Sequence, residues 1–222
     1  MKLIAVNGGP RKTWNTGTVL KHALEGAQEA GAEVETFHLY DLQYQGCTSC
    51  LACKRKGYAR PGQCAMRDGL TPLLEAVQTC DALILASPIY IGNVTGAMRS
   101  LMERLLFAPL TYTPDYGSVF QGKVHSLSIY TMGVPENLMV QQNYPVLFES
   151  YRQRLTMLGG TSEVLTVNDT FQFEDYSRYV SSRFDPEHKA RVKAEQFPLD
   201  CQKAFEKGKE LVERARKEKL TN

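Results

Sequence analysis

Apolar residues along the chain follow two different periodicities. Continuous apolar runs occupy residues 3–6 and 82–86, and strand-like patterns occur at residues 33–39, 124–130 and 162–167. Short runs of this kind predict β-strands, and the continuous ones are typical of strands buried on both faces. The run at 3–6 ends in Asn-Gly-Gly-Pro, which marks a turn. The chain is therefore predicted to contain five strands.

Segments between these strands have helical spacing. Residues 16–30 carry an apolar stripe that ends at Gly31, and residues 96–107 form a clearly amphipathic pattern. Residues 73–79 and 145–158 are also predicted to be helical, the latter ending at Gly159 and Gly160. A charged helix over residues 190–219 is predicted to be interrupted near Pro198.

Strands that alternate with helices predict an α/β domain with a parallel sheet covered on both faces. We expect one domain over residues 1–167, in which residues 44–68 are an insertion, followed by an extension over 168–222. Ligands of such folds bind beyond the carboxyl ends of the strands. That rule selects the loops 7–16, 87–93 and 131–137.

Composition and charge narrow the function classes. The net charge of +2 gives no indication of nucleic-acid or membrane binding, and no apolar run is long enough to span a bilayer. The first residues lead directly into the first strand without a signal-peptide pattern, which favours a cytoplasmic protein. Six cysteines in a reducing compartment favour thiols or metal ligands over structural disulfides.

The first loop, NGGPRKTWNT, has the features of an anion site. A helix that starts after it offers free N–H groups and a positive dipole end, and Arg11 or Lys12 could add charge. The glycines of a Walker A loop and of a Rossmann fingerprint are absent. A loop for a single phosphate is the remaining functional interpretation, with an ordinary strand-to-helix turn as its alternative.

The second loop, SPIYIGNVTG, follows the strand at 82–86 and precedes the amphipathic helix. Pro88 stiffens the turn, and Gly92 allows a backbone to approach a ligand closely. Tyr90 and Ile91 offer flat apolar surface that suits a planar ring, although Tyr90 could equally pack against a neighbouring element.

GGPRKTWNT together with SPIYIGNVTGAMRSLMER resembles the NAD(P)H-dependent FMN reductase and iron–sulfur flavoprotein branch of the flavodoxin-like superfamily. The resemblance implies a three-layer sandwich with strand order 2-1-3-4-5. It places Pro10, Arg11, Asn15 and Thr16 around the FMN phosphate, with Gly9 where the family usually has serine. It implies isoalloxazine contacts from two further loops, formed by Pro88, Ile89, Tyr90, Ile91, Gly92 and Asn93 and by Thr131, Met132 and Gly133.

The implied activity is hydride transfer from NAD(P)H through FMN to a small acceptor such as a quinone or a free flavin. An alternative is an electron-transfer protein with FMN and a [4Fe–4S] cluster that serves ferredoxin-like partners. A third interpretation is a zinc or redox-sensing module that has lost flavin binding. The resemblance also implies a homodimer, or a tetramer built from dimers.

Four cysteines in the insertion carry the second candidate site. Cys47, Cys50 and Cys53 form a C-x2-C-x2-C run, and Cys64 follows after ten intervening residues. Such a set could hold a [4Fe–4S] cluster, bind zinc, or consist of free or redox-active thiols. Five cations and no acidic residue lie between Leu42 and Asp68, and this charge is expected to lower the pKa values of the thiols. Cys80 and Cys201 are expected to be structural.

The extension begins with an aromatic-rich stretch over residues 168–185. Aromatic side chains outside the regular domain pattern suit a subunit interface or a cover over the flavin, and packing on their own domain is an equal alternative. The charges of the C-terminal helix are expected to form a solvated face.

Overall fold

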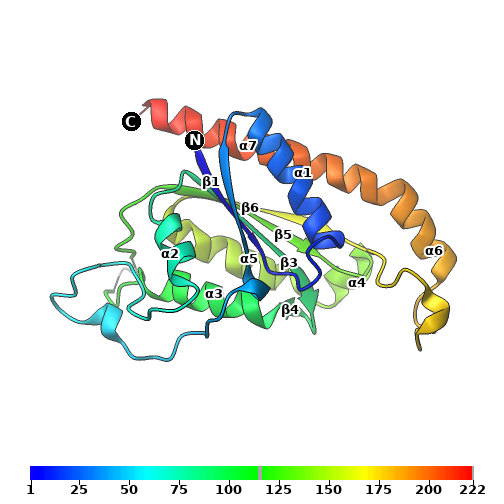
Figure 1. The fold of residues 1–222 in the computed structure, drawn as a ribbon, viewed down its shortest axis with the longest axis horizontal. Helices are drawn as coiled ribbons and strands as arrows, with labels where there is room; N and C mark the ends of the chain where they lie inside the picture. The colour runs from blue at the N-terminus through cyan, green and yellow to red at the C-terminus, as the bar shows by residue number, and fades with distance from the viewer. Residues whose placement is uncertain (115–116, 222) are drawn as a thin grey trace.

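A three-layer arrangement is evident in the computed structural model, which describes residues 1–114 and 117–221 (Figure 1). The central sheet has five parallel strands in the order β2-β1-β3-β5-β6. A two-residue strand, β4 (Asn93–Val94), pairs antiparallel with the end of β3. Leaving β4 aside, the order is the predicted 2-1-3-4-5. The bounds of the five strands are β1 (Lys2–Asn7), β2 (Glu33–His38), β3 (Ala82–Tyr90), β5 (Val124–Thr131) and β6 (Gly159–Val167).

Alternation within β1 explains why both faces of the sheet are covered. Ile4 and Val6 belong to one apolar cluster, whereas Leu3 and Ala5 belong to another on the opposite face. Successive side chains of a strand point to opposite faces, so a strand with helices on both sides must be apolar throughout. The uninterrupted apolar run at the start of the chain is the consequence.

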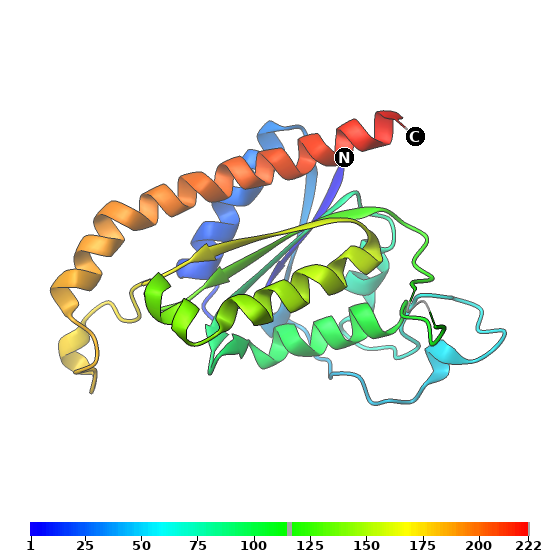
Figure 2. The ribbon, with the colours of Figure 1, turned by 180° about the vertical axis from the view of Figure 1, so that it is seen from behind.

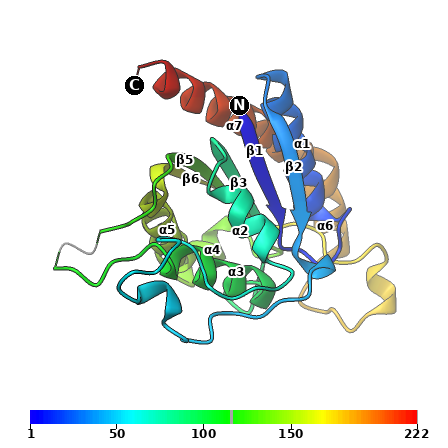
Figure 3. The same ribbon diagram turned by 60° about the vertical axis from the view of Figure 1, so that its left-hand side comes forward.

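The helices divide between the two faces (Figures 2 and 3). Helices α1 (Asn15–Glu29) and α7 (Phe197–Thr221) cover one face, and α2 (Thr71–Val77), α3 (Gly96–Phe107) and α5 (Tyr144–Leu155) cover the other. Helices α1 and α7 approach closely because each has a glycine facing the backbone of the other. A Cβ on Gly208 would lie 1.8 Å from the carbonyl oxygen of Ala23, and a Cβ on Gly26 would lie 2.0 Å from that of Phe205. The charged side chains of α7 thus surround a buried stripe.

Three details differ from the sequence prediction. Helix α4 (Glu136–Gln141) was not predicted, and β6 begins at Gly159, where a helix end was expected. The C-terminal helix begins earlier than residue 190, as α6 (Pro186–Arg191), because the Asp185 side chain accepts hydrogen bonds from two N–H groups of its first turn. The expected interruption near Pro198 is a π-helical turn (Val192–Gln196) between α6 and α7.

Two irregular segments lie on opposite sides of the molecule (Figures 1 and 2). The cysteine-rich insertion follows β2 and contains short 3₁₀ turns at Leu39–Asp41 and Ala52–Lys54. The aromatic-rich segment connects β6 to α6 and contains a 3₁₀ turn at Tyr176–Arg178, and a further 3₁₀ turn, Thr156–Leu158, precedes β6. None of the helices in the described ranges is long and apolar enough to cross a membrane.

Candidate functional site

The loop between β1 and α1 is held by the buried side chain of Asn7. Its amide oxygen accepts a hydrogen bond from the N–H of Gly9 (2.9 Å), and its amide nitrogen donates to the carbonyl of Lys12 (3.5 Å). A Cβ on Gly9 would lie 3.2 Å from that amide oxygen, which is a tight contact. Asn7 therefore shapes the loop around Gly9.

Helix α1 begins where the loop ends, with Asn15 and Thr16 buried in its first turn. The preceding Trp14 gives this turn no side-chain cap, so the turn can offer its N–H groups to an anion. The Asn15 amide donates to the carbonyl of Phe171 (2.7 Å), while its oxygen is buried without a partner. The indole N–H of Trp14 is also buried and unpartnered. Unsatisfied buried polar atoms at a helix start are typical of a ligand site.

The loop after β3 forms a tight hairpin with β4. Ile91 and Gly92 occupy its two central positions with φ values of 50° and 74°. This conformation is costly for a β-branched residue, and Ile91 nevertheless presents its whole side chain to solvent. The side-chain oxygen of Asn93 accepts from the hydroxyl of Tyr151 (2.9 Å). Burial is the main factor that raises the pKa of Tyr90, and nearby Arg11 partly offsets it.

The loops after β5 and β6 complete the enclosure. Thr131 shares a 2.6 Å hydrogen bond with Thr16, so the third loop contacts the start of α1. The N–H of Thr170 donates to the carbonyl of Met132 (3.0 Å), and the Arg11 guanidinium donates to the carbonyl of Gln172 (3.1 Å). The segment after β6 thereby becomes a wall of the same site.

These loops surround one hollow at the carboxyl ends of the strands. Eleven of the fourteen residues predicted to contact FMN line it: Gly9, Pro10, Arg11, Asn15, Thr16, Pro88, Ile89, Tyr90, Thr131, Met132 and Gly133. The other three, Ile91, Gly92 and Asn93, lie at and beside the hairpin tip outside the lining. Trp14, Thr170 and Gln172 also line the hollow and were not predicted.

Comparison with known proteins agrees with this geometry. The family model for NADPH-dependent FMN reductase matches residues 1–162. The chain belongs to the NADPH-dependent FMN reductase family.

Two curated relatives from Archaeoglobus fulgidus are both named iron–sulfur flavoprotein. The first is 34% identical over a stretch that covers 64% of this chain and 61% of the relative. The second is 30% identical over a stretch that covers 66% of this chain and 79% of the relative. The chain thus spans less than two thirds of the first relative. Among solved structures, the NAD(P)H:quinone oxidoreductase from Methanothermobacter marburgensis is similar with a TM-score of 0.71 at 14% identity. That match covers 94% of this chain and 98% of the other, and it confirms the flavodoxin-like fold.

The cysteine-rich insertion of this family member is tied to α3. Arg104, whose side chain is fully buried, pairs with Asp68 and donates to the carbonyls of Gln45 and Met66 (3.2 Å each). Lys54 donates to the carbonyl of Ala108 (3.1 Å) and to other carbonyls at the end of α3. Arg104 thus holds both ends of the insertion, and Lys54 holds its middle.

Cys50 is exposed, whereas Cys47, Cys53 and Cys64 are half-buried. Within the described ranges, no three His, Cys, Asp or Glu side chains are close enough together to hold a metal ion. The four thiols are therefore not arranged as a preformed ligand set in this conformation, and the cluster interpretation stays a prediction.

The expectation that positive charge lowers the thiol pKa values is wrong for Cys53. Burial raises the pKa of this thiol, and the opposing effect of Lys54 is smaller. Two of the five cations are also occupied elsewhere, since Arg60 and Arg67 both pair with Glu75. Outside the insertion, Cys80 and Cys201 are buried as expected, and burial raises their pKa values to about 12 and about 11.

Proposed function

We propose that this protein is an FMN-dependent oxidoreductase that takes hydride from NAD(P)H and reduces a small acceptor. The observation that carries this proposal is the convergence of four loops on one hollow at the carboxyl ends of β1, β3, β5 and β6. The first of these loops leads into an uncapped helix start, which suits a phosphate. The family match supports the same cofactor.

Different residues of the hollow are proposed to bind the phosphate and the ring of FMN. The first turn of α1, with Asn15 and Thr16, is proposed to hold the phosphate, and the exposed guanidinium of Arg11 would add charge-assisted hydrogen bonds. Tyr90, an exposed aromatic side chain in the lining, offers apolar contact to a planar ring. The free indole N–H of Trp14 supplies one more donor. When bound, FMN supplies the hydride-accepting chemistry, and the protein supplies position and electrostatics.

A comparison of FMN with riboflavin tests this assignment. Titration calorimetry is expected to show much tighter binding of FMN, because riboflavin lacks the phosphate that the α1 loop would hold. Purified protein loaded with FMN is expected to oxidise NADPH when a quinone or a free flavin is present. A protein that binds neither FMN nor riboflavin, or binds them equally, contradicts the proposed phosphate loop.

The second candidate function is an iron–sulfur flavoprotein that carries FMN and a [4Fe–4S] cluster and exchanges electrons with ferredoxin-like partners. Four cysteines in one insertion and the names of the two curated relatives favour it. Iron and acid-labile sulfide analysis of anaerobically purified protein decides between the two functions.

Assembly and location complete the proposal. We expect a homodimer, or a tetramer built from dimers, because two apolar side chains are fully exposed, Ile91 on the hairpin after β3 and Val180 in the aromatic-rich segment. Light scattering on the purified protein measures this directly. A cytoplasmic location is also part of the proposal.

A further inference from the structure

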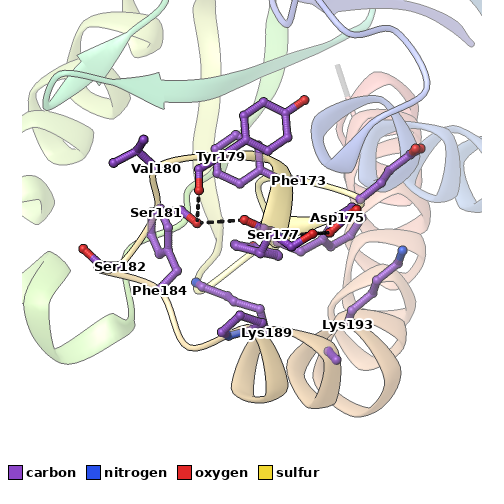
Figure 4. A pocket seen from close by; sticks show the side chains of 15 residues that line it. Phe173, Asp175, Ser177, Tyr179, Val180, Ser181, Ser182, Phe184, Lys189 and Lys193 are labelled. Atoms are coloured by element: carbon purple, nitrogen blue, oxygen red, sulfur yellow. Dashed lines mark hydrogen bonds between the residues drawn. The ribbon is translucent and has the colours of Figure 1, made fainter.

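Lys189 is a buried lysine outside the part of the chain that matches the family model. It lies in α6, whereas the match ends at residue 162. Figure 4 shows Lys189 on α6, below the aromatic-rich segment in that view. Only 3% of the residue is exposed, although its neighbours Glu187 and Ala190 are exposed. Because lysine is almost never fully buried unless its charge is paired, its partners show what it does.

The charge of Lys189 is paired with Asp169, which follows the end of β6. One carboxylate oxygen of Asp169 accepts from the Lys189 ammonium, and the other is hydrogen-bonded to the ring of His188 (2.5 Å). Asp169 has a φ of 56°, which is uncommon for a residue other than glycine. Backbone conformations of this kind persist where the surrounding structure holds them. The pair thus fixes the backbone directly after β6.

The ammonium of Lys189 also binds the third loop of the proposed FMN site. It donates to the carbonyls of Gly133 (2.9 Å), Asp169 (3.2 Å) and Thr170 (3.4 Å). Gly133 belongs to the loop after β5, and the other two residues belong to the loop after β6. Gly133 and Thr170 both line the hollow that is proposed to hold FMN. One side chain of the extension therefore joins two of the four loops around that hollow.

Backbone hydrogen bonds connect the same two loops. The N–H of Thr170 donates to the carbonyl of Met132 (3.0 Å), and the N–H of Asp169 donates to that of Val134 (3.0 Å). The C=O and the N–H of a trans peptide point in opposite directions, so the N–H of Gly133 points away from Thr170. This N–H has no acceptor within the described part of the chain. It is therefore available to donate to a ligand.

The contacts of Lys189 differ from those of a simple buried ion pair. Desolvation offsets much of the attraction in such a pair, and apolar residues of similar volume often stabilise a protein as well. Lys189 in addition binds backbone carbonyls from two separate loops, at Gly133 and Thr170. Those hydrogen bonds fix the position of the backbone, which an apolar side chain in the same place does not do.

We propose that Lys189 is a positioning residue of the flavin site, and that it holds residues 131–133 where they contact the ring of FMN. The inference rests on the proposed flavin site. Lys189 does not line the FMN hollow itself, so it acts through Gly133 and Thr170. The extension beyond residue 162 is thus part of the flavin site.

Binding of two flavins tests this role. Lys189→Met keeps an apolar side chain of similar length and removes the ammonium. The Kd of FMN and the Kd of riboflavin should both rise about tenfold, because a loop residue that is no longer held must be ordered again on binding. The ratio of the two Kd values should not change, because the phosphate loop is untouched. The visible circular dichroism of bound FMN should change, since residues 131–133 are proposed to contact the ring.

Arg104→Met is the matched control. Arg104 is also fully buried, pairs with Asp68 and donates to backbone carbonyls, but it holds the cysteine-rich insertion. This variant should lose thermal stability as Lys189→Met does and keep both flavin affinities. If it weakens flavin binding equally, general destabilisation explains the loss and the proposal is overturned. Unchanged affinities in Lys189→Met, or a loss confined to FMN, overturn it as well.

Hydrogen exchange in flavin-free protein gives a measurement that needs no cofactor. In Lys189→Met, the N–H groups of Asp169 and Thr170 should exchange about tenfold faster, because the bonds between the two loops are no longer held by the ammonium. Exchange in β1 and β3 should stay as in the wild type. Unchanged exchange at Asp169 and Thr170 contradicts the proposal.

Two further measurements keep the test decisive. If Lys189→Met does not fold, Asp169→Asn combined with Lys189→Met leaves no unpaired carboxylate, and the same results are expected. In the wild-type protein, riboflavin should slow exchange in residues 131–134 and in α6 together, and slower exchange in the loop alone overturns the proposal. A wild-type protein that binds neither flavin refutes the proposed flavin site and the role of Lys189 with it. Normal binding that Lys189→Met leaves unchanged refutes only the role of Lys189.

Discussion

Gly17 gives the sharpest test of the phosphate loop. This glycine is the third residue of α1, and a Cβ at its position would lie 1.7 Å from the carbonyl oxygen of Lys12. Real Cβ contacts are essentially never shorter than 3.0 Å, so Gly17→Ala has to displace the loop by about 1.3 Å. The close contact is with backbone, and a side-chain rotation cannot relieve it.

The expected consequence is weaker FMN binding. Donor–acceptor distances of good hydrogen bonds span only about 0.5 Å, so a displacement of this size breaks bonds from the loop to a phosphate. One lost hydrogen bond to a charged group costs about 1.5–3 kcal/mol, which corresponds to a roughly ten- to hundredfold increase in Kd. Titration calorimetry with FMN measures the change, and circular dichroism shows whether the variant is folded.

Gly96→Ala is the matched control. Gly96 is the first residue of α3, and a Cβ there meets nothing within 4 Å. Alanine at that position is expected to keep the FMN affinity and to stabilise the helix by about 0.5–1 kcal/mol. If a folded Gly17→Ala protein binds FMN as tightly as Gly96→Ala does, the α1 loop does not hold the phosphate.

Three further changes separate the parts of the site. Replacing Asn15 and Thr16 together by alanine should weaken FMN binding by about 1–3 kcal/mol while riboflavin binding changes little, and calorimetry with an unchanged FMN affinity would place the phosphate elsewhere. Replacing Cys47 and Cys50 by serine should leave FMN binding intact and remove any iron and sulfide, so a variant unable to take up FMN would reveal coupled sites. Ile91→Gly should raise the melting temperature by about 2–4 °C, because glycine tolerates the φ of 50°, and a lower melting temperature would show that Ile91 makes compensating contacts.

Local patterns predicted most of the fold. The helix at 96–107 was predicted at its observed bounds from its amphipathic pattern alone. The structure adds a cap, since the Thr95 hydroxyl accepts from the N–H of Met98 (3.2 Å). The two glycines at 159 and 160 misled the prediction of β6. A Cβ on Gly160 would lie 2.4 Å from the carbonyl of Val124, so this glycine serves close strand packing rather than a helix end. That role depends on a distant strand and leaves no local signal.

The same reasoning applies to the candidate site. The residues of the first two loops could be predicted as site residues because each loop lies between a strand and a helix that the sequence pattern predicts. Thr170 and Gln172 could not be predicted as site residues, because only hydrogen bonds between segments far apart in the sequence bring them to the site. The bond from Asn15 to the carbonyl of Phe171 joins residues 156 positions apart. Trp14 lay inside the predicted loop, and its buried indole N–H shows its relevance only in three dimensions.

Phe171 links the matched domain to the extension. Its ring lies 4.9 Å from that of Trp14 at the start of α1 and 6.1 Å from that of Phe197 at the start of α7, while its carbonyl accepts from Asn15. The extension is therefore packed on the element that would hold the phosphate. Since α7 also packs along α1 through Gly208, the extension and the FMN site share one rigid support.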